Sequence, residues 1–183
     1  MAEQVVVVIL TGPVGSGKTT TMRALGDLLS AGHIPHAVLD VDQVRTFYPV
    51  PPDDRFGERI GLRNVQAIAA NYREEGARVL VLATVIETNE SVVTKFAGAI
   101  PNAAITVVRL NVPMETILDR LERRESASTI AWYRHRAPEL QEIMERENIG
   151  DIVIDVGQRT PHDIASEIAH RLGLLPNPDG DVP

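Results

Sequence analysis

A glycine-rich stretch directly after the first apolar run limits how this chain can fold. The apolar run, Val5 to Leu10, is rich in β-branched residues, as expected of a strand buried on both faces. It leads into Gly12-Pro13-Val14-Gly15-Ser16-Gly17-Lys18-Thr19, which fits the pattern G-x-x-x-x-G-K-[ST]. A helix is expected next, from about Lys18 to Ser30. A strand, a loop and a helix in this order predict a turn whose backbone N–H groups surround phosphates.

The residue types in this loop suit a nucleotide with a magnesium ion. Glycines leave room for the backbone to turn inward, where a Cβ atom would obstruct it. We expect Lys18 to present an exposed charge to the β- and γ-phosphates as a catalytic residue, and the Thr19 hydroxyl to ligate Mg²⁺. ATP and Mg²⁺ are therefore the predicted cofactors. The candidate nucleotide-binding residues of the loop are Gly12, Gly15, Ser16, Gly17, Lys18, Thr19 and Thr20.

The rest of the chain alternates strands with stretches of helical spacing. This alternation predicts an α/β protein with a five-stranded parallel sheet in a three-layer P-loop NTPase fold. Ligands in such folds bind at the carboxyl ends of the strands, so the residues just after each strand are the first to consider. The further strand candidates are His36 to Asp40, Arg78 to Ile86, Ala104 to Leu110 and Asp151 to Val156.

Length and composition fit one domain. The 183 residues are 44% hydrophobic, enough for one shared core, and we expect a single domain at residues 1–172 with a flexible tail at 173–183.

The 25 acidic residues outnumber the 18 basic ones, which makes nucleic acid an unfavoured partner. No signal-like or membrane-spanning stretch is seen, so we expect a cytoplasmic protein with a small-molecule substrate. Formation of a homodimer stays open.

Two acids and an arginine follow the second predicted strand. Asp40 and Asp42 would share a face of a strand, and Arg45 lies one turn into the following helix. One carboxylate can hold Mg²⁺, and another can orient an attacking hydroxyl and accept its proton. We assign Asp42 as catalytic residue and metal ligand, and Asp40, Asp42 and Arg45 as substrate-binding residues. An Asp at this place can also simply cap the helix.

The glycine-rich loop and the segment Leu39-Asp40-Val41-Asp42-Gln43-Val44-Arg45 together resemble the adenylylsulfate kinase group of small P-loop kinases. Gluconate, shikimate and chloramphenicol kinases are similar in outline. The resemblance implies transfer from MgATP to a small acceptor, with Asp42 near the reacting hydroxyl and Arg45 on the acceptor. The chain departs from the group after the third strand, where Val85-Ile86-Glu87-Thr88 replaces a Phe-Ile-Ser-Pro segment.

The segment Arg120-Leu121-Glu122-Arg123-Arg124 resembles the arginine-bearing entrance of the lid in nucleoside-monophosphate-type kinases. The resemblance implies that one arginine packs on the adenine and that another neutralises the transferring phosphoryl group. We therefore assign Arg120 to nucleotide binding and Arg124 to catalysis, with Arg123 as a weaker candidate, in a helical lid at about residues 120–146. Basic residues at a helix end also suit the helix dipole and solvent.

Further candidates lie around the expected acceptor and adenine sites. Trp132, the only Trp, can grip an acceptor, although a lone Trp in a helix more often belongs to a core or an interface. Arg63 and Glu87 are candidate substrate-binding residues, with a solvated helix face and a helix-start acid as the alternatives. Gly157 and Arg159 lie where similar kinases hold the edge of the adenine.

These features predict an ATP-dependent kinase that phosphorylates a hydroxyl of a small metabolite or natural product. One alternative is a kinase for an RNA or tRNA end or for a nucleotide sugar, as in zeta-type toxins. Another is a regulator that binds ATP without being a kinase.

Overall fold

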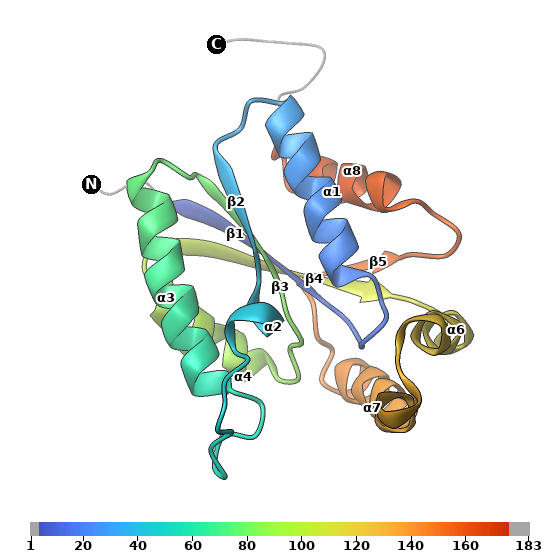
Figure 1. Cartoon of the computed structure of the whole chain (residues 1–183). Helices are drawn as coiled ribbons and strands as arrows, with labels where there is room; N and C mark the ends of the chain where they lie inside the picture. Colours follow the sequence, from blue (N-terminus) through green and yellow to red (C-terminus); the bar gives the residue numbers. More distant parts are fainter. Residues whose placement is uncertain (1–3, 176–183) are drawn as a thin grey trace.

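A computed structural model describes residues 4–175, in which five strands form one parallel sheet between layers of helices (Figure 1). The order of the strands across the sheet is β2-β3-β1-β4-β5. The predicted α/β fold with a five-stranded parallel sheet is therefore confirmed. The strands are β1 (Val5–Thr11), β2 (His36–Asp40), β3 (Val79–Ala83), β4 (Ala103–Asn111) and β5 (Ile152–Asp155).

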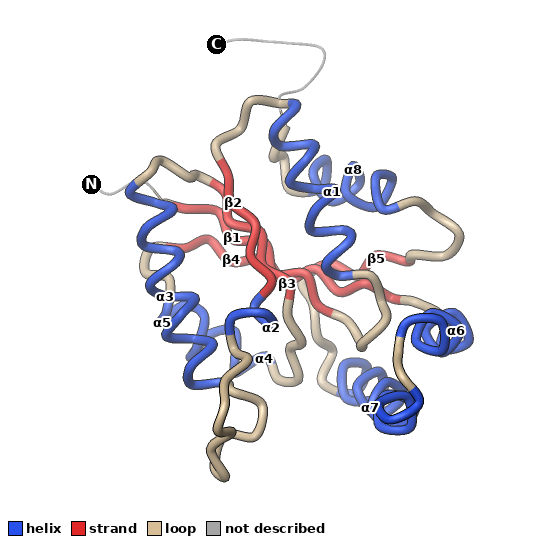
Figure 2. Tube along the Cα trace, in the orientation of Figure 1, coloured by secondary structure: helices blue, strands red, loops and turns tan. Residues whose placement is uncertain are grey.

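Helices cover both faces of this sheet (Figures 1 and 2). Helices α1 and α8 pack together on one face, and α3 lies with the short helices α4 and α5 on the other. No helix within residues 4–175 has the length and apolarity needed to cross a membrane. The helices are α1 (Lys18–Ala31), α2 (Val41–Val44), α3 (Glu58–Glu74), α4 (Asn89–Ser91), α5 (Ala97–Ala99), α6 (Met114–Arg124), α7 (Ala127–Arg146) and α8 (Pro161–Arg171), with a π-helical stretch, η1 (Val92–Phe96), between α4 and α5.

Alternation along β1 creates two hydrophobic cores. Val7 and Ile9 pack into the core beneath α3, whereas Val8 and Leu10 pack into the core beneath α1 and α8. All four side chains are fully buried. A strand covered on both faces needs apolar residues at every position, which explains the unbroken run in the sequence.

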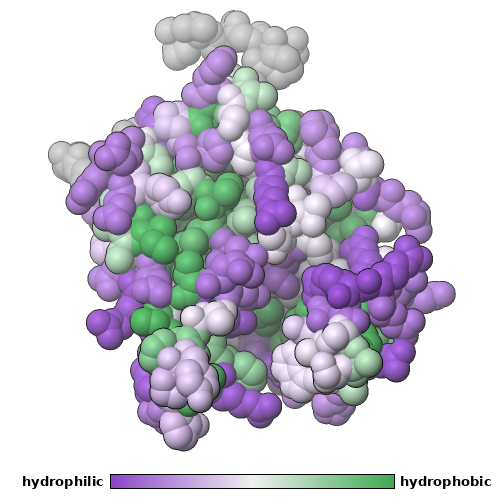
Figure 3. Space-filling view, in the orientation of Figure 1, coloured by the Kyte–Doolittle hydropathy of each residue, from purple (hydrophilic) through white to green (hydrophobic). Residues whose placement is uncertain are grey.

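Helices α6 and α7 lie beyond the carboxyl ends of β1 and β4 (Figure 1). Helix α7 contributes to both cores, because Ala137 packs with the α1 side and Met144 with the α3 side. The segment 45–57, between α2 and α3, projects on the opposite side. In the space-filling view these two parts form lobes on either side of a hollow at the carboxyl edge of the sheet (Figure 3).

Two predicted boundaries, the end of the third strand and the start of the C-terminal tail, lie elsewhere in the structure. Strand β3 ends at Ala83, not at Ile86: the pairing with β1 and β2 stops at Ala83, and the Ile86 N–H bonds a side chain, Thr11 Oγ1, at 2.9 Å. The expected tail begins at Gly173, yet Leu174 is buried against α1 and α8, so the packed chain reaches at least this residue. Residues 176–183 of the expected tail lie outside the described part of the chain.

Candidate active site

The loop between β1 and α1 forms a cradle of backbone groups. At Gly12 the φ angle is +149°, and a Cβ atom there would lie 2.7 Å from Ser16 Oγ and 3.0 Å from the Leu110 carbonyl oxygen. The close packing therefore requires glycine. The Ser16 hydroxyl inside the loop is buried without a hydrogen-bond partner among the residues described. A tightly packed glycine-rich loop at a helix N-terminus, with an unsatisfied hydroxyl, fits the phosphates of a nucleotide.

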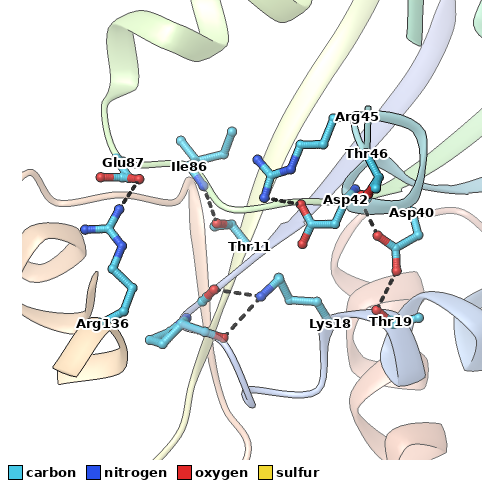
Figure 4. Close-up of polar contacts among 12 residues, drawn as sticks. Thr11, Lys18, Thr19, Asp40, Asp42, Arg45, Thr46, Ile86, Glu87 and Arg136 are labelled. Carbon is cyan, nitrogen blue, oxygen red and sulfur yellow. Dashed lines mark hydrogen bonds and ion pairs between the residues drawn. The ribbon is translucent and has the colours of Figure 1, made fainter. Parts of the chain in front are cut away.

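Lys18 differs from the prediction, because its side chain is only 8% exposed. The amine folds back and donates to the carbonyl oxygens of Gly12 at 2.9 Å and Pro13 at 3.1 Å (Figure 4). Burial lowers the pKa of Lys18 to about 8, and the nearby carboxylates of Asp42 and Asp40 only partly counter this effect. Phosphate oxygens are stronger acceptors than carbonyls, so a nucleotide would draw the amine away from its own loop.

The acid beside Thr19 is Asp40. The Thr19 hydroxyl donates to Asp40 Oδ2 at 2.8 Å, while Asp40 Oδ1 accepts the N–H of Asp42 at 3.1 Å and caps α2. Asp42 instead forms an ion pair with Arg45 at 2.7 Å (Figure 4). The structure thus brings Thr19 together with Asp40, and not with the predicted metal ligand Asp42.

A hydroxyl next to a carboxylate fits Mg²⁺. This ion commonly takes one or two protein ligands and completes its shell with water and phosphate oxygens. Within residues 4–175, no group of three or more His, Cys, Asp and Glu side chains could hold a metal ion by itself. Thr19 and Asp40 would therefore hold Mg²⁺ only together with the phosphates of a nucleotide.

Three adjoining cavities follow the carboxyl edge of the sheet. The central cavity, of about 580 Å³, lies over the cradle and is lined by Lys18, Thr19, Asp40 and Asp42. A cavity of about 310 Å³ lies beside α8, and we name it the α8-side cavity. A third cavity, of about 440 Å³, reaches under α3 and α7, and we name it the α3-side cavity. The central cavity shares Gly15, Gly17, Thr20 and Arg124 with the α8-side cavity, and Arg45, Arg55, Phe56, Val85 and Trp132, among others, with the α3-side cavity.

The predicted arginines gather around the α8-side cavity. Arg120 donates to the carbonyl oxygens of Gly15 at 3.3 Å and Ser16 at 3.4 Å, so α6 is tied to the cradle. Arg124 and Arg159 also line this cavity. Two candidates do not line any of the three cavities. The weaker candidate Arg123 pairs with Asp119 at 2.9 Å on the exposed side of α6, and the predicted nucleotide-binding residue Gly157 is exposed in the loop after β5.

The predicted acceptor residues are brought together only in part. Arg45, Glu87 and Trp132 line the α3-side cavity. Arg63 is exposed on α3 and lines none of the three cavities. The face of α3 that does reach the α3-side cavity carries Glu58, Gly61 and Leu62.

Arg136 was not assigned a role, yet it connects three parts of the α3-side cavity. Its side chain is 15% exposed and forms ion pairs with Glu87 at 2.6 Å and Glu139 at 2.9 Å. Burial alone would lower the pKa of Arg136, but the hydrogen bonds to Glu139 and Glu87 outweigh it and raise the pKa. Its guanidinium also lies 5.9 Å from the centre of the Phe56 ring. Its position one helical turn after Trp132 was the available signal, because residues four apart share a helix face.

The glycine-rich cradle, the order of the parallel strands and the cavities at their carboxyl ends together define a P-loop kinase fold. Residues 8–150 match the family model described as an AAA domain, and the chain belongs to that family. No curated protein matches the chain.

Solved structures that share the fold include two small-molecule kinases. The tunicamycin resistance protein of Deinococcus radiodurans has 20% identity and a TM-score of 0.66, with 95% of this chain and 100% of that chain covered. The APS kinase of Mycobacterium tuberculosis, in complex with AMPPNP and APS, has 21% identity and a TM-score of 0.61, covering 93% and 98%. The shikimate kinase of Acinetobacter baumannii, in complex with shikimate, has 18% identity and a TM-score of 0.60, covering 94% and 95%. The resemblance to the adenylylsulfate kinase group is thus confirmed at the level of the fold.

Proposed function

We propose that the protein is an ATP-dependent phosphotransferase that transfers the γ-phosphoryl group to a hydroxyl of a small molecule. One observation carries this proposal: the central cavity over the cradle adjoins a second cavity of about 440 Å³, and Arg45, Phe56 and Trp132 line both. A protein that only binds and hydrolyses a nucleotide has no need of a second cavity beside the phosphates.

The nucleotide would occupy the α8-side and central cavities. The base would lie near Arg120 and Arg159, and the phosphates would lie in the cradle between Lys18 and Arg124. The complex of the similar APS kinase with AMPPNP supports ATP as the donor. Mg²⁺ held at Thr19 and Asp40 would supply charge neutralisation on the β- and γ-phosphates.

The acceptor hydroxyl would approach from the α3-side cavity. Asp42 and Arg45 line the central cavity, and Arg45 also lines the α3-side cavity, so both are placed to orient the hydroxyl. As the hydroxyl oxygen bonds to the γ-phosphorus, the bond to the leaving ADP oxygen breaks and the hydroxyl proton passes to Asp42. Phosphoryl transfer depends mainly on positioning and charge neutralisation, so we expect Asp42 to act chiefly by orienting the hydroxyl.

The first prediction concerns Asp42→Asn. This variant keeps the shape of the side chain but removes its charge and its proton acceptor. We expect kcat to fall by about 10²- to 10⁴-fold, while MgATP affinity by calorimetry changes only a few-fold. The acceptor for this assay comes from an ADP-release screen over metabolites and antibiotics, with a mass gain of one phosphoryl group required of each hit.

Asp119→Asn, in an exposed ion pair on α6, is the matched control and should leave kcat unchanged. A normal kcat for Asp42→Asn would remove this residue from the mechanism. ADP release that responds to RNA and to no small hydroxyl compound would favour a kinase for nucleic-acid ends. ADP release that responds to neither would favour a regulator. The cytoplasmic location and a homodimer stay predictions.

A further inference from the structure

We infer that the acceptor is an electrically neutral hydroxyl compound with an apolar face, and not an anionic metabolite. The inference rests on the proposed kinase function and deepens it. It follows from one juxtaposition in the α3-side cavity: its partly buried cations, Arg45, Lys95 and Arg136, are already paired with carboxylates, and the uncharged part of its lining is mostly apolar or aromatic.

The formal charges that line the α3-side cavity cancel. A site for an acidic metabolite needs an excess of positive charge, because a buried carboxylate or phosphate is costly without a partner. Here the basic and acidic side chains are equal in number. The basic ones are Arg45, Arg55, Lys95 and Arg136, and the acidic ones are Asp53, Asp54, Glu58 and Glu87.

Three of the four basic side chains that line this cavity are each paired with at least one carboxylate. Arg136, the least exposed of them at 15%, is held by Glu87 and Glu139. Arg45 pairs with Asp42 at 2.7 Å, and Lys95 pairs with Glu58 at 2.6 Å. An anionic acceptor would have to displace one of these carboxylates or lie beside it. Both arrangements cost free energy that a neutral acceptor avoids.

Arg55 is the one basic side chain of this cavity without an ion pair among residues 4–175. It is exposed at the rim, where its guanidinium lies 5.7 Å from the centre of the Phe56 ring, and it also lines the central cavity. A charge at an exposed rim is screened by water and salt, so it adds little selectivity for anions.

The apolar walls offer the surface that a neutral acceptor can cover. Phe56 is 50% exposed and Trp132 is 43% exposed, and both line the central and the α3-side cavities. They come from the two lobes that flank the hollow in Figure 3, the segment 45–57 and helix α7. Rigid aromatic side chains at the mouth of a cavity suit a flat or apolar face of a ligand. Val85, Ile86, Phe96 and Leu140 line the interior.

Trp132 allows the acceptor to be tested by binding as well as by turnover. As the only tryptophan, it reports ligands in this cavity through its fluorescence. The probes are pairs of a neutral compound and an acidic counterpart: methyl shikimate with shikimate, which keep the same hydroxyls, and chloramphenicol with its succinate ester and uridine with its 5′-monophosphate, in which the acidic group replaces one free hydroxyl. Each is titrated into the full-length protein with Mg²⁺ and AMPPNP, and each is also tested for ADP release with MgATP.

We expect at least one neutral member to change Trp132 fluorescence and to bind at least about tenfold more tightly than its acidic partner. Equal or tighter binding of the acidic members overturns the inference, and so does the absence of a response to every neutral member. Phosphorylation of acidic members alone also overturns it, while leaving the kinase function intact. A neutral member that binds selectively but is never phosphorylated contradicts the kinase function instead.

A variant of the protein tests whether the ion pairs cause the selectivity against anionic acceptors. Glu87→Gln removes the carboxylate that lines the cavity, while Glu139 still pairs with Arg136 and supports the fold. We expect the ratio of acidic to neutral affinity to rise by about tenfold. Glu90→Gln, a nearby exposed acid that does not line the cavity, should leave the ratio unchanged. An unchanged ratio in Glu87→Gln overturns the explanation.

Discussion

Among single residues, Lys18 has the most unusual environment. Its buried amine has a pKa lowered from 10.5 to about 8, with burial as the main cause. Between these values the unfolded chain binds more protons than the folded one, so stability rises with pH. Charged Lys18 therefore costs folding stability below about pH 8, and the cost disappears as the pH approaches 10.5. This cost falls on a residue that we propose binds the nucleotide, so stability is sacrificed for the proposed function.

The second prediction tests this cost with Lys18→Met, which keeps the length of the side chain and removes its charge. We expect ADP release to be abolished. The free energy of unfolding of the variant minus that of the wild type should be larger at pH 7 than at pH 10 by about 1–3 kcal/mol, because the variant escapes the cost of the buried charge. Urea denaturation at the two pH values measures this difference. A difference that does not change with pH would contradict the lowered pKa.

The third prediction concerns Asp40, whose carboxylate caps α2 and accepts the Thr19 hydroxyl. Asp40→Asn keeps the cap, since Asn and Asp cap helices about equally well, but it removes the charge beside Thr19. We expect the Mg²⁺ concentration for half-maximal activity to rise about tenfold or more, with little change in the melting temperature. Asp42→Asn should not shift the Mg²⁺ requirement. A normal Mg²⁺ requirement in Asp40→Asn together with a raised one in Asp42→Asn would instead identify Asp42 as the metal ligand.

Among the elements, the start of α3 positions Arg45. A Cβ atom at Gly61 would lie 2.9 Å from Arg45 Cβ, and one at Gly57 would collide with the Arg45 carbonyl oxygen. Helix α3 therefore packs directly on the backbone and side chain of Arg45. This packing explains how a residue after a four-residue helix, α2, keeps a defined place between two cavities.

The fourth prediction is that Gly61→Ala impairs the acceptor side alone. The added methyl group should displace Arg45 and lower kcat/KM for the acceptor by about tenfold, with little effect on the KM for ATP. Gly98→Ala is the matched control, because a Cβ atom at Gly98 meets nothing within 4 Å. It should leave both constants unchanged and be neutral or stabilising by up to about 1 kcal/mol. Equal losses for ATP and acceptor in Gly61→Ala would show a general disturbance of the fold.

At the scale of the whole molecule, the ligand cavities lie where both cores meet the carboxyl edge of the sheet. Helix α7 packs on both cores through Ala137 and Met144, and its exposed Trp132 lines two of the cavities. A ligand bound there should therefore stabilise the folded protein as one unit, since only the folded chain assembles the site.

The fifth prediction concerns how far a bound nucleotide raises the temperature of thermal unfolding. MgADP at about 100 times its Kd should stabilise the protein by about 2.7 kcal/mol, which corresponds to a rise in Tm of about 5–10 °C for a domain of this size. Differential scanning calorimetry measures the shift. Lys18→Met should lose most of it, whereas Gly61→Ala should keep it. A shift that persists in Lys18→Met would place the nucleotide elsewhere.

Several features of the fold could be predicted because they depend on short stretches of chain. The unbroken apolar run of β1 reflects burial on both faces, and the local capping box of Thr160 and Asp163 starts α8. The cradle depends on glycine spacing between a strand and a helix. None of these features requires knowledge of which distant segments meet.

The sequence by itself thus determined the fold class and the glycine-rich cradle between β1 and α1, because both arise from local patterns. Only the tertiary structure decided which acid meets Thr19: β2 ends at Asp40 and α2 begins at Val41, so Asp40 and Asp42 do not share a strand face. It also decided that Glu87 neutralises Arg136, 49 residues away in the chain. Such pairings follow from how helices rotate and pack on the sheet, which depends on side-chain volumes throughout both cores and not on any local motif.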